Sequence, residues 1–170
     1  STKALYQCEN AALAINTAVL LGIDEESVRA GIKAMKWAGR MEKIADGIYL
    51  DGAHNEDGVE ACLKSVKHMP GEKVLLFAVV NDKKYESMIE QIVKSGAFEH
   101  ILVTKAGEDR ATDVNMIADI FRSKAKGEIQ IEAYENIGEA YNRSLEIRDN
   151  RTLIVTGSLY LVGEIKDLIF

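Results

Sequence analysis

The sequence predicts an α/β protein with a mostly parallel sheet covered by helices on both faces, preceded by a helical hairpin. One observation is that short apolar runs alternate with amphipathic segments along most of the chain. Another is that two of these runs, KVLLFAVV and TLIVTGS, are almost continuously apolar, as expected of parallel strands buried on both faces. A third is that the first part of the chain shows helical periodicity instead.

The hairpin is predicted at the start of the chain. Apolar residues recur there at helical spacing, namely Ala11, Ala12, Ile15, Val19 and Leu20. Gly22 then stops the first helix, and Asp24 is placed to cap a second helix that runs to about Lys36. We therefore assign residues 1–36 to the hairpin and residues 37–170 to the α/β domain.

Strands and helices are expected to alternate through the second part. The strands are predicted at Ile48–Asp51, Lys73–Val80, His100–Thr104, Glu128–Glu132 and Thr152–Thr156. The helices are predicted at about 56–68, 84–96, 113–125, 135–147 and 159–169. Parallel strands need crossover connections, so this alternation indicates a Rossmann-like sheet. Glu42–Ile44 is expected to add an antiparallel edge strand.

Composition narrows the classes of function. With 170 residues, 47% of them hydrophobic, the chain can bury one main core. The net charge of -6 and the scattered Lys and Arg residues argue against nucleic-acid binding. The longest apolar stretch, Ala11–Ile23, is shorter than the roughly 20 residues that span a bilayer, so no membrane segment or signal peptide is expected. Cys8 and Cys62 are predicted to be small buried hydrophobes, which favours a reducing cytoplasm.

The turn YLDGAHNEDG follows the first predicted parallel strand and precedes a helix. Loops at the carboxyl ends of such strands form the ligand crevice of an open α/β sheet. Asp51 could accept hydrogen bonds from two adjacent hydroxyls, as a ribose requires, while His54 and Asn55 stand at a helix N-terminus that favours an anion. The alternative is that Asp51 or Asn55 caps the helix and His54 packs on its neighbours.

A second loop, TGSLYLVGE, closes the last predicted strand and lies at the same sheet edge. Ser158 could offer a hydroxyl and backbone donors to a carboxylate, or could simply cap the final helix. The segment lacks the second glycine of a nucleophile elbow, so hydrolase chemistry is disfavoured. The chain also carries no G-x-x-x-x-G-K-[ST] and no G-x-G-x-x-G motif, so it has no loop of its own to hold a triphosphate.

Five segments together resemble a known family. In order, YQCENAALAINTAVLL, WAGRMEKI, YLDGAHNEDG, VVNDKKYESM and VTGSLYLVGEIK are similar to the carboxyl-terminal third of the folylpolyglutamate synthase and dihydrofolate synthase family, within the Mur ligase superfamily. The resemblance implies an ATP-dependent amide ligase. In such an enzyme ATP phosphorylates a carboxylate of a folate, and the amine of L-glutamate attacks the acyl phosphate.

The resemblance also implies a division of labour between domains. A central ATPase domain with a P-loop supplies the phosphate grip and holds Mg²⁺, and the carboxyl-terminal domain closes over ATP and glutamate. Residues 1–36 resemble the last helices of that central domain, and residues 37–170 resemble the whole closing domain. We expect a cytoplasmic monomer, and we expect the chain alone to lack ligase and ATPase activity.

Roles for single residues follow from the resemblance alone. Asp51 is similar to the aspartate that binds the ATP ribose, and Arg40 to the arginine that approaches the nucleotide phosphates. His54 and Ser158 match positions near the nucleotide and the incoming glutamate, so the expected catalytic set is Arg40, His54 and Ser158. Asn55 belongs to the nucleotide-side motif.

One further site residue is expected on the glutamate side. Lys83 is similar to the lysine of the family's Asp-Lys pair, although Lys84 stands where a third acidic residue often follows. Two other functions remain open. One is a different Mur-type ligase that joins amino acids to cell-wall precursors, where a Tyr more often occupies the position of Gly52. The other is a stand-alone nucleotide-binding regulatory module.

Overall fold

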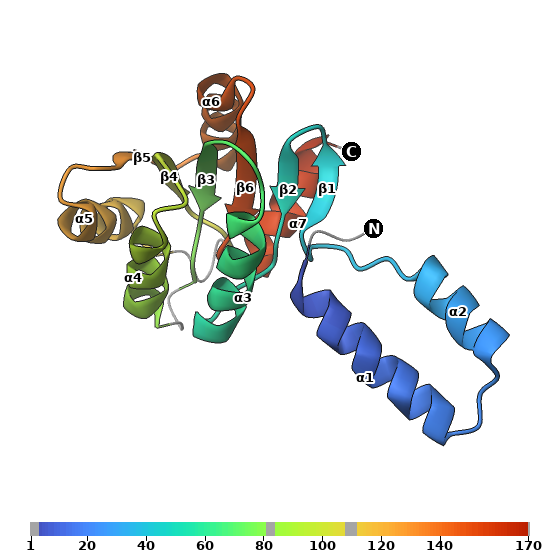
Figure 1. Ribbon diagram of the computed structural model, residues 1–170. Coiled ribbons are helices and arrows are strands. Elements are labelled where there is room, and N and C mark those ends of the chain that lie inside the picture. The colour runs from blue at the N-terminus through green and yellow to red at the C-terminus, as the bar shows by residue number, and fades with distance from the viewer. Residues whose placement is uncertain (1–3, 81–83, 108–111, 170) are drawn as a thin grey trace.

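The computed structural model describes residues 4–80, 84–107 and 112–169. Within these residues the chain forms seven α-helices and one six-stranded sheet (Figure 1). The sheet is mostly parallel and carries helices on both faces, and a helical hairpin precedes it. The predicted fold class is therefore confirmed.

The hairpin consists of α1 (Tyr6–Leu20) and α2 (Glu25–Ala34). Asp24 caps α2, because its Oδ1 accepts a hydrogen bond from the Ser27 backbone N–H at 2.8 Å. The hairpin extends away from the sheet at the lower right of Figure 1. Its second helix ends at Ala34, two residues before the predicted Lys36.

The strands lie in the order β1-β2-β6-β3-β4-β5. Their bounds are β1 (Glu42–Ala45), β2 (Ile48–Leu50), β3 (Lys73–Phe77), β4 (His100–Thr104), β5 (Gln130–Tyr134) and β6 (Thr152–Thr156). β1 pairs antiparallel with β2 at the edge, as predicted, and the other pairs are parallel. β3 ends at Phe77 rather than Val80.

β5 begins two residues later than predicted. Lys126 and Gly127 have φ values of +51° and +87°, and the Glu128 N–H donates to Ala125 O in the turn. This turn uses residues that the sequence pattern assigned to the strand.

Two helical layers bury the two faces of the sheet. One contains α3 (Glu56–Lys67), α4 (Tyr85–Ser95) and α5 (Val114–Ala125), and the other α6 (Ile137–Arg148) and α7 (Leu159–Ile169). Phe77 of β3 meets Phe121 of α5 edge-to-face, with ring centroids 5.4 Å apart. The strand order places β2 beside β6, so the loops that follow these strands are neighbours.

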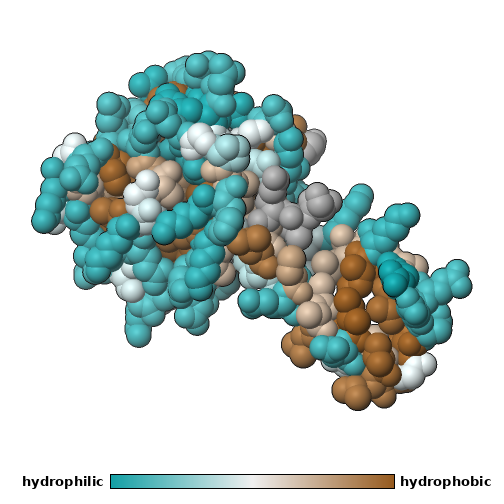
Figure 2. All heavy atoms as spheres, viewed as in Figure 1, coloured by the Kyte–Doolittle hydropathy of each residue, from teal (hydrophilic) through white to brown (hydrophobic). Residues whose placement is uncertain are grey.

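The hairpin, in contrast, leaves its apolar residues in solvent. Figure 2 shows hydrophobic side chains gathered on it, and the exposed ones include Leu13, Ile15, Val19, Leu20, Leu21 and Ile23. Cys62 is buried as predicted, but the prediction for Cys8 is wrong, because no described residue covers that side of α1 and Cys8 is exposed. In the part of the chain that the structure describes, no helix is long and apolar enough to cross a membrane.

Candidate functional site

The turn after β2 carries three of the predicted site residues. The Asn55 side chain caps α3 by accepting a hydrogen bond from the Gly58 N–H at 2.8 Å. The His54 ring is half-buried, and its Nδ1 lies 2.8 Å from Gly52 O. Asn55 is thus a helix cap, the alternative left open by the sequence, and His54 is turned back onto its own loop.

The loop after β6 meets this turn directly. The Gly157 N–H donates to Ala53 O at 3.0 Å, and Leu159 packs over Gly52. Ser158 is buried, and its hydroxyl oxygen accepts a hydrogen bond from the Tyr160 N–H at 3.1 Å at the start of α7. The two loops therefore share one corner of the carboxyl edge, as their positions in the sequence indicated.

Arg40 reaches the same corner from the linker that follows the hairpin. The Gly52 N–H donates to Gly39 O at 2.7 Å, which holds this linker against the turn. A Cβ on Gly52 would stand 2.7 Å from Arg40 Nη1. The half-buried guanidinium thus lies across Gly52, and any larger residue there would displace it.

Asp51 lies at the centre of this corner and is only 1% exposed. Its Oδ2 accepts hydrogen bonds from the Tyr6 hydroxyl at 2.8 Å and from the Met41 N–H at 2.9 Å. Its Oδ1 accepts one from the Ala53 N–H at 2.9 Å. Oδ1 consequently has more unused acceptor capacity than Oδ2.

Burial and hydrogen bonding act on Asp51 in opposite directions. Burial raises the pKa of the carboxyl group, while hydrogen bonds from Tyr6, Ala53 and Met41 and the charge of Arg40 lower it. Burial prevails, and the pKa of Asp51 is raised from its ordinary value. Burial, followed by the charge of Asp51, also raises the pKa of Tyr6, so its hydroxyl remains a donor.

Tyr6 is the residue at this corner that sequence reasoning missed. It starts α1, while the turn it contacts lies 45 residues further along the chain. The segment YQCENAALAINTAVLL entered the resemblance, but nothing in its pattern indicated a contact with Asp51. Lys83 lies outside the described residues. Among the residues that are described, no group of three His, Cys, Asp or Glu side chains could hold a metal ion.

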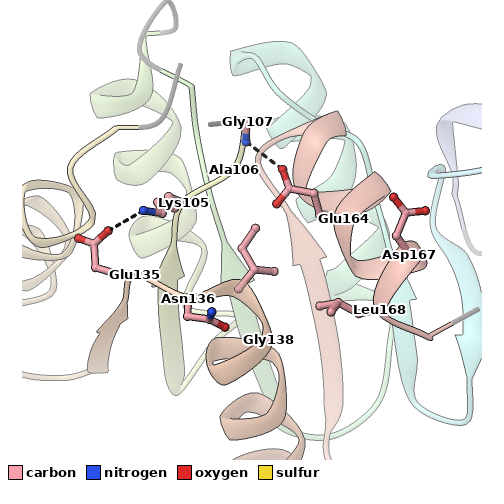
Figure 3. Close-up of a pocket in the computed structure, with 10 residues that line it drawn as sticks. Lys105, Ala106, Gly107, Glu135, Asn136, Gly138, Glu164, Asp167 and Leu168 are labelled. Atoms are coloured by element: carbon pink, nitrogen blue, oxygen red, sulfur yellow. Dashed lines mark hydrogen bonds and ion pairs between the residues drawn. The ribbon is translucent and has the colours of Figure 1, made fainter. Parts of the chain in front are cut away.

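A separate pocket of about 400 Å³ opens further along the same sheet edge. Figure 3 shows Lys105 and Glu135 after β4 and β5, facing Glu164 and Asp167 of α7. Lys105 is paired with Glu135, and Glu164 accepts a hydrogen bond from the Gly107 N–H. None of the predicted site residues lines this pocket.

The chain is similar to a known protein family and to several of its characterised members. Residues 39–159 match the family described as Mur ligase, glutamate ligase domain. The folylpolyglutamate synthase of Lacticaseibacillus casei is 29% identical over 171 residues, which cover 95% of the chain and 38% of that protein. The dihydrofolate synthase/folylpolyglutamate synthase of Bacillus subtilis is 28% identical, again over 95% of the chain and 38% of the relative.

A solved structure shows the same arrangement. The folylpolyglutamate synthase of Mycobacterium tuberculosis, complexed with ADP and AMPPCP, superposes with a TM-score of 0.87 at 25% identity. The match covers 97% of this chain and 40% of that one. The chain thus spans about two fifths of the length of each of these proteins.

Proposed function

Because the chain belongs to the Mur ligase family through its glutamate ligase domain, we propose that it is the carboxyl-terminal domain of an ATP-dependent ligase that adds L-glutamate to folates. The observation that carries this proposal is the match along 95% of the chain to folylpolyglutamate synthases. The convergence of Arg40, Asp51 and Ser158 at one corner supports it. We propose dihydrofolate synthase activity as a second activity of the same site, because the Bacillus subtilis relative carries both names.

We propose that the linker and the β2–α3 turn form the nucleotide side of the site. Arg40 has a permanent positive charge and a planar fork that suits two phosphate oxygens. The ribose role of Asp51 would use its Oδ1, which accepts one hydrogen bond, whereas Oδ2 already accepts two. The N-terminal ends of α3 and α7, at Asn55 and Ser158, favour anionic groups of the bound substrates.

The chemistry of such a ligase requires no covalent bond between this domain and the substrates. ATP gives its γ-phosphoryl group to a folate carboxylate, and the glutamate amine then displaces phosphate from the acyl phosphate to form the amide. Positioning and compensation of charge account for most of the catalysis of phosphoryl transfer. His54 and Ser158 are proposed on the glutamate side, with Lys83. Excluding water by closure would protect the acyl phosphate from hydrolysis.

The hairpin is proposed to belong to the central ATPase domain of the longer protein. Its exposed apolar side chains, among them Leu13 and Leu20, have no cover within the described chain. A helix pair with such a face needs a packing partner. We further propose that the central domain holds Mg²⁺ and the triphosphate, and that the whole protein is a cytoplasmic monomer.

A chimeric enzyme tests the proposed function. The matching carboxyl-terminal segment of the Lacticaseibacillus casei relative is replaced by this chain, and ATP-dependent addition of glutamate to a folate is measured. We expect turnover, a fall in kcat of about 100-fold for Arg40→Ala, and mainly a higher KM for ATP with Asp51→Ala. Arg122→Ala, which removes an exposed arginine of α5, is the matched control. A folded chimera without turnover would contradict the proposal.

The isolated chain separates the proposed function from the regulatory-module alternative. Calorimetry with ATP, with and without Mg²⁺, is expected to show little or no binding, because the phosphate grip is proposed to lie elsewhere. Tight binding that Asp51→Ala abolishes would show a complete nucleotide site, and the stand-alone module would then be the better description.

A further inference from the structure

The Asp51 carboxylate joins three segments that are distant in the sequence. Tyr6 comes from the first turn of α1, Met41 from the linker that carries Arg40, and Ala53 from the β2–α3 turn. Tyr6 supplies the hydrogen bond that comes from the hairpin. The orientation of the carboxylate therefore depends on where the hairpin stands.

We propose that Tyr6 is a positioning residue for the ligase reaction, whose hydroxyl holds Asp51 and, through Asp51, the Arg40 linker in the arrangement that meets ATP. This inference rests on the proposed function. It adds a residue of the hairpin to the site, so the position of the hairpin affects the geometry of the site.

The connection from Asp51 to Arg40 runs through Met41. Met41 has a φ of +46°, a left-handed conformation that is unfavourable for a non-glycine residue. Such a conformation persists only where surrounding contacts fix it. The hydrogen bond from the Met41 N–H to Asp51 Oδ2 is one of these contacts. Because Arg40 is the preceding residue, loss of this bond would free its guanidinium from its place across Gly52.

The start of α1 is attached to the α/β domain while the rest of the hairpin is not. Ala4 is buried in the core on the α3 side of the sheet, and the Leu5 N–H donates to Ser65 Oγ at 3.1 Å. Beyond Gln7, α1 has no buried residue, and α2 has none. A movement of the hairpin would thus reach the site through this short anchored segment, and Tyr6 is its contact with Asp51.

The groups around Asp51 determine in which direction the loss of the Tyr6 hydroxyl should move its pKa. The groups that face it are Tyr6 from α1, Arg40 from the linker and Cys62 from α3. Burial raises the pKa of Asp51, and the Tyr6 hydrogen bond is foremost among the interactions that lower it. Without the hydroxyl the pKa should rise further, so Asp51 would become neutral at a higher pH.

The first test uses the chain as it is, with the pKa of Asp51 followed by carboxyl ¹³C NMR. Tyr6→Phe keeps the ring and removes the hydroxyl, and should raise the pKa of Asp51 further. It should also speed amide exchange at Met41 about fivefold. Tyr141→Phe, a buried tyrosine on the opposite face of the sheet, should change neither quantity.

A second variant keeps this test decisive if Tyr6→Phe folds poorly. Replacing Tyr6 with 3-fluorotyrosine makes the hydroxyl a stronger donor, so the pKa of Asp51 should fall instead. Opposite shifts in the two variants support the proposal. An unchanged pKa of Asp51 in either folded variant would overturn it.

The second test uses the chimeric ligase and its dependence on pH. Tyr6→Phe should lower kcat about tenfold with little change in the KM for folate, and should move the acid limb of the rate profile to higher pH. An unaltered profile in an active chimera would overturn the positioning role. An inactive parent chimera would count against the proposed function instead, while the NMR test would still decide the contact.

Discussion

The hairpin and the α/β domain treat apolar residues in opposite ways. Every residue of β3 and of β4 is buried, and helices cover both faces of the sheet. In α1 the buried residue is the polar Gln7, while Leu20 is 87% exposed. Apolar residues thus form a finished core in one region and an uncovered face in the other.

This difference separates a region that folds around its own core from one whose apolar face stays uncovered among the described residues. In the α/β domain, helices of the same chain cover both faces of the sheet. In the hairpin, Asp24 caps α2, yet Gln7 Oε1 is buried without a hydrogen-bond partner among the described residues. The Tyr6–Asp51 hydrogen bond lies where the two regions meet, and so does the candidate site.

The same glycine-to-alanine change should have opposite effects in the two regions. Gly157 has a φ of +106°, and an added Cβ would meet Ala78 O and stand 2.6 Å from the Phe77 ring. Gly157→Ala should therefore cost at least about 4 kcal/mol of the free energy of unfolding. Gly31, inside α2 with open space around it, should gain about 1 kcal/mol of local helix stability as alanine.

Urea unfolding measures the first effect, and amide exchange in α2 measures the second. A cost below about 1 kcal/mol for Gly157→Ala would show that the corner between the β2 and β6 loops is looser than the structure indicates. A loss of exchange protection in α2 with Gly31→Ala would contradict the open surroundings of that residue.

Truncating a leucine sharpens the contrast in packing. Leu75 of β3 is fully buried, so Leu75→Ala should lower the free energy of unfolding by about 3 kcal/mol. Leu20→Ala in α1 should change it by less than about 0.5 kcal/mol in the isolated chain. In the chimeric ligase, Leu20→Ala should become costly if the central domain covers the hairpin. Thermal unfolding of both proteins makes the comparison, and equal costs for Leu20→Ala would remove the reason for assigning the hairpin to that domain.

The sequence predicted the elements well because their signals are local. Short apolar runs between amphipathic segments indicate the strands, and Asp24 and Asn55 cap α2 and α3. The start of β5 was misplaced because Lys126, a non-glycine residue in the left-handed conformation, gives no clear turn signal. The sequence pattern was sufficient to predict those features that depend on residues close together in the chain.

The site was only partly predictable because its contacts are not local. The carboxyl-edge rule brings the loops of Asp51 and Ser158 together once the strand order is given. It cannot reveal that Tyr6 closes over Asp51, because that contact depends on how the hairpin is oriented. The exposure of Cys8 has the same origin, since periodicity does not tell whether the covering partner belongs to the chain.

The smallest expected difference between the hairpin and the α/β domain concerns their ion pairs. In the α/β domain, Glu132 of β5 accepts hydrogen bonds from His100, Tyr134 and Arg143. Burial alone would raise the pKa of Glu132, but these three donors outweigh it and the pKa is lowered. In the hairpin, Glu25 pairs with Arg29 while both side chains are 77% exposed.

A lowered pKa means that the Glu132 contacts stabilise the fold above the ordinary glutamate pKa of about 4.3 and are lost as pH falls below it. Glu132→Gln should therefore cost about 1 kcal/mol at pH 7 and less at about pH 3, which lies below the ordinary pKa. Glu25→Gln should leave the free energy of unfolding unchanged at both, because exposed pairs contribute little. Urea unfolding at the two pH values measures all three proteins. If the cost of Glu132→Gln were the same at both, the stabilisation would come from the shape of the side chain rather than its charge.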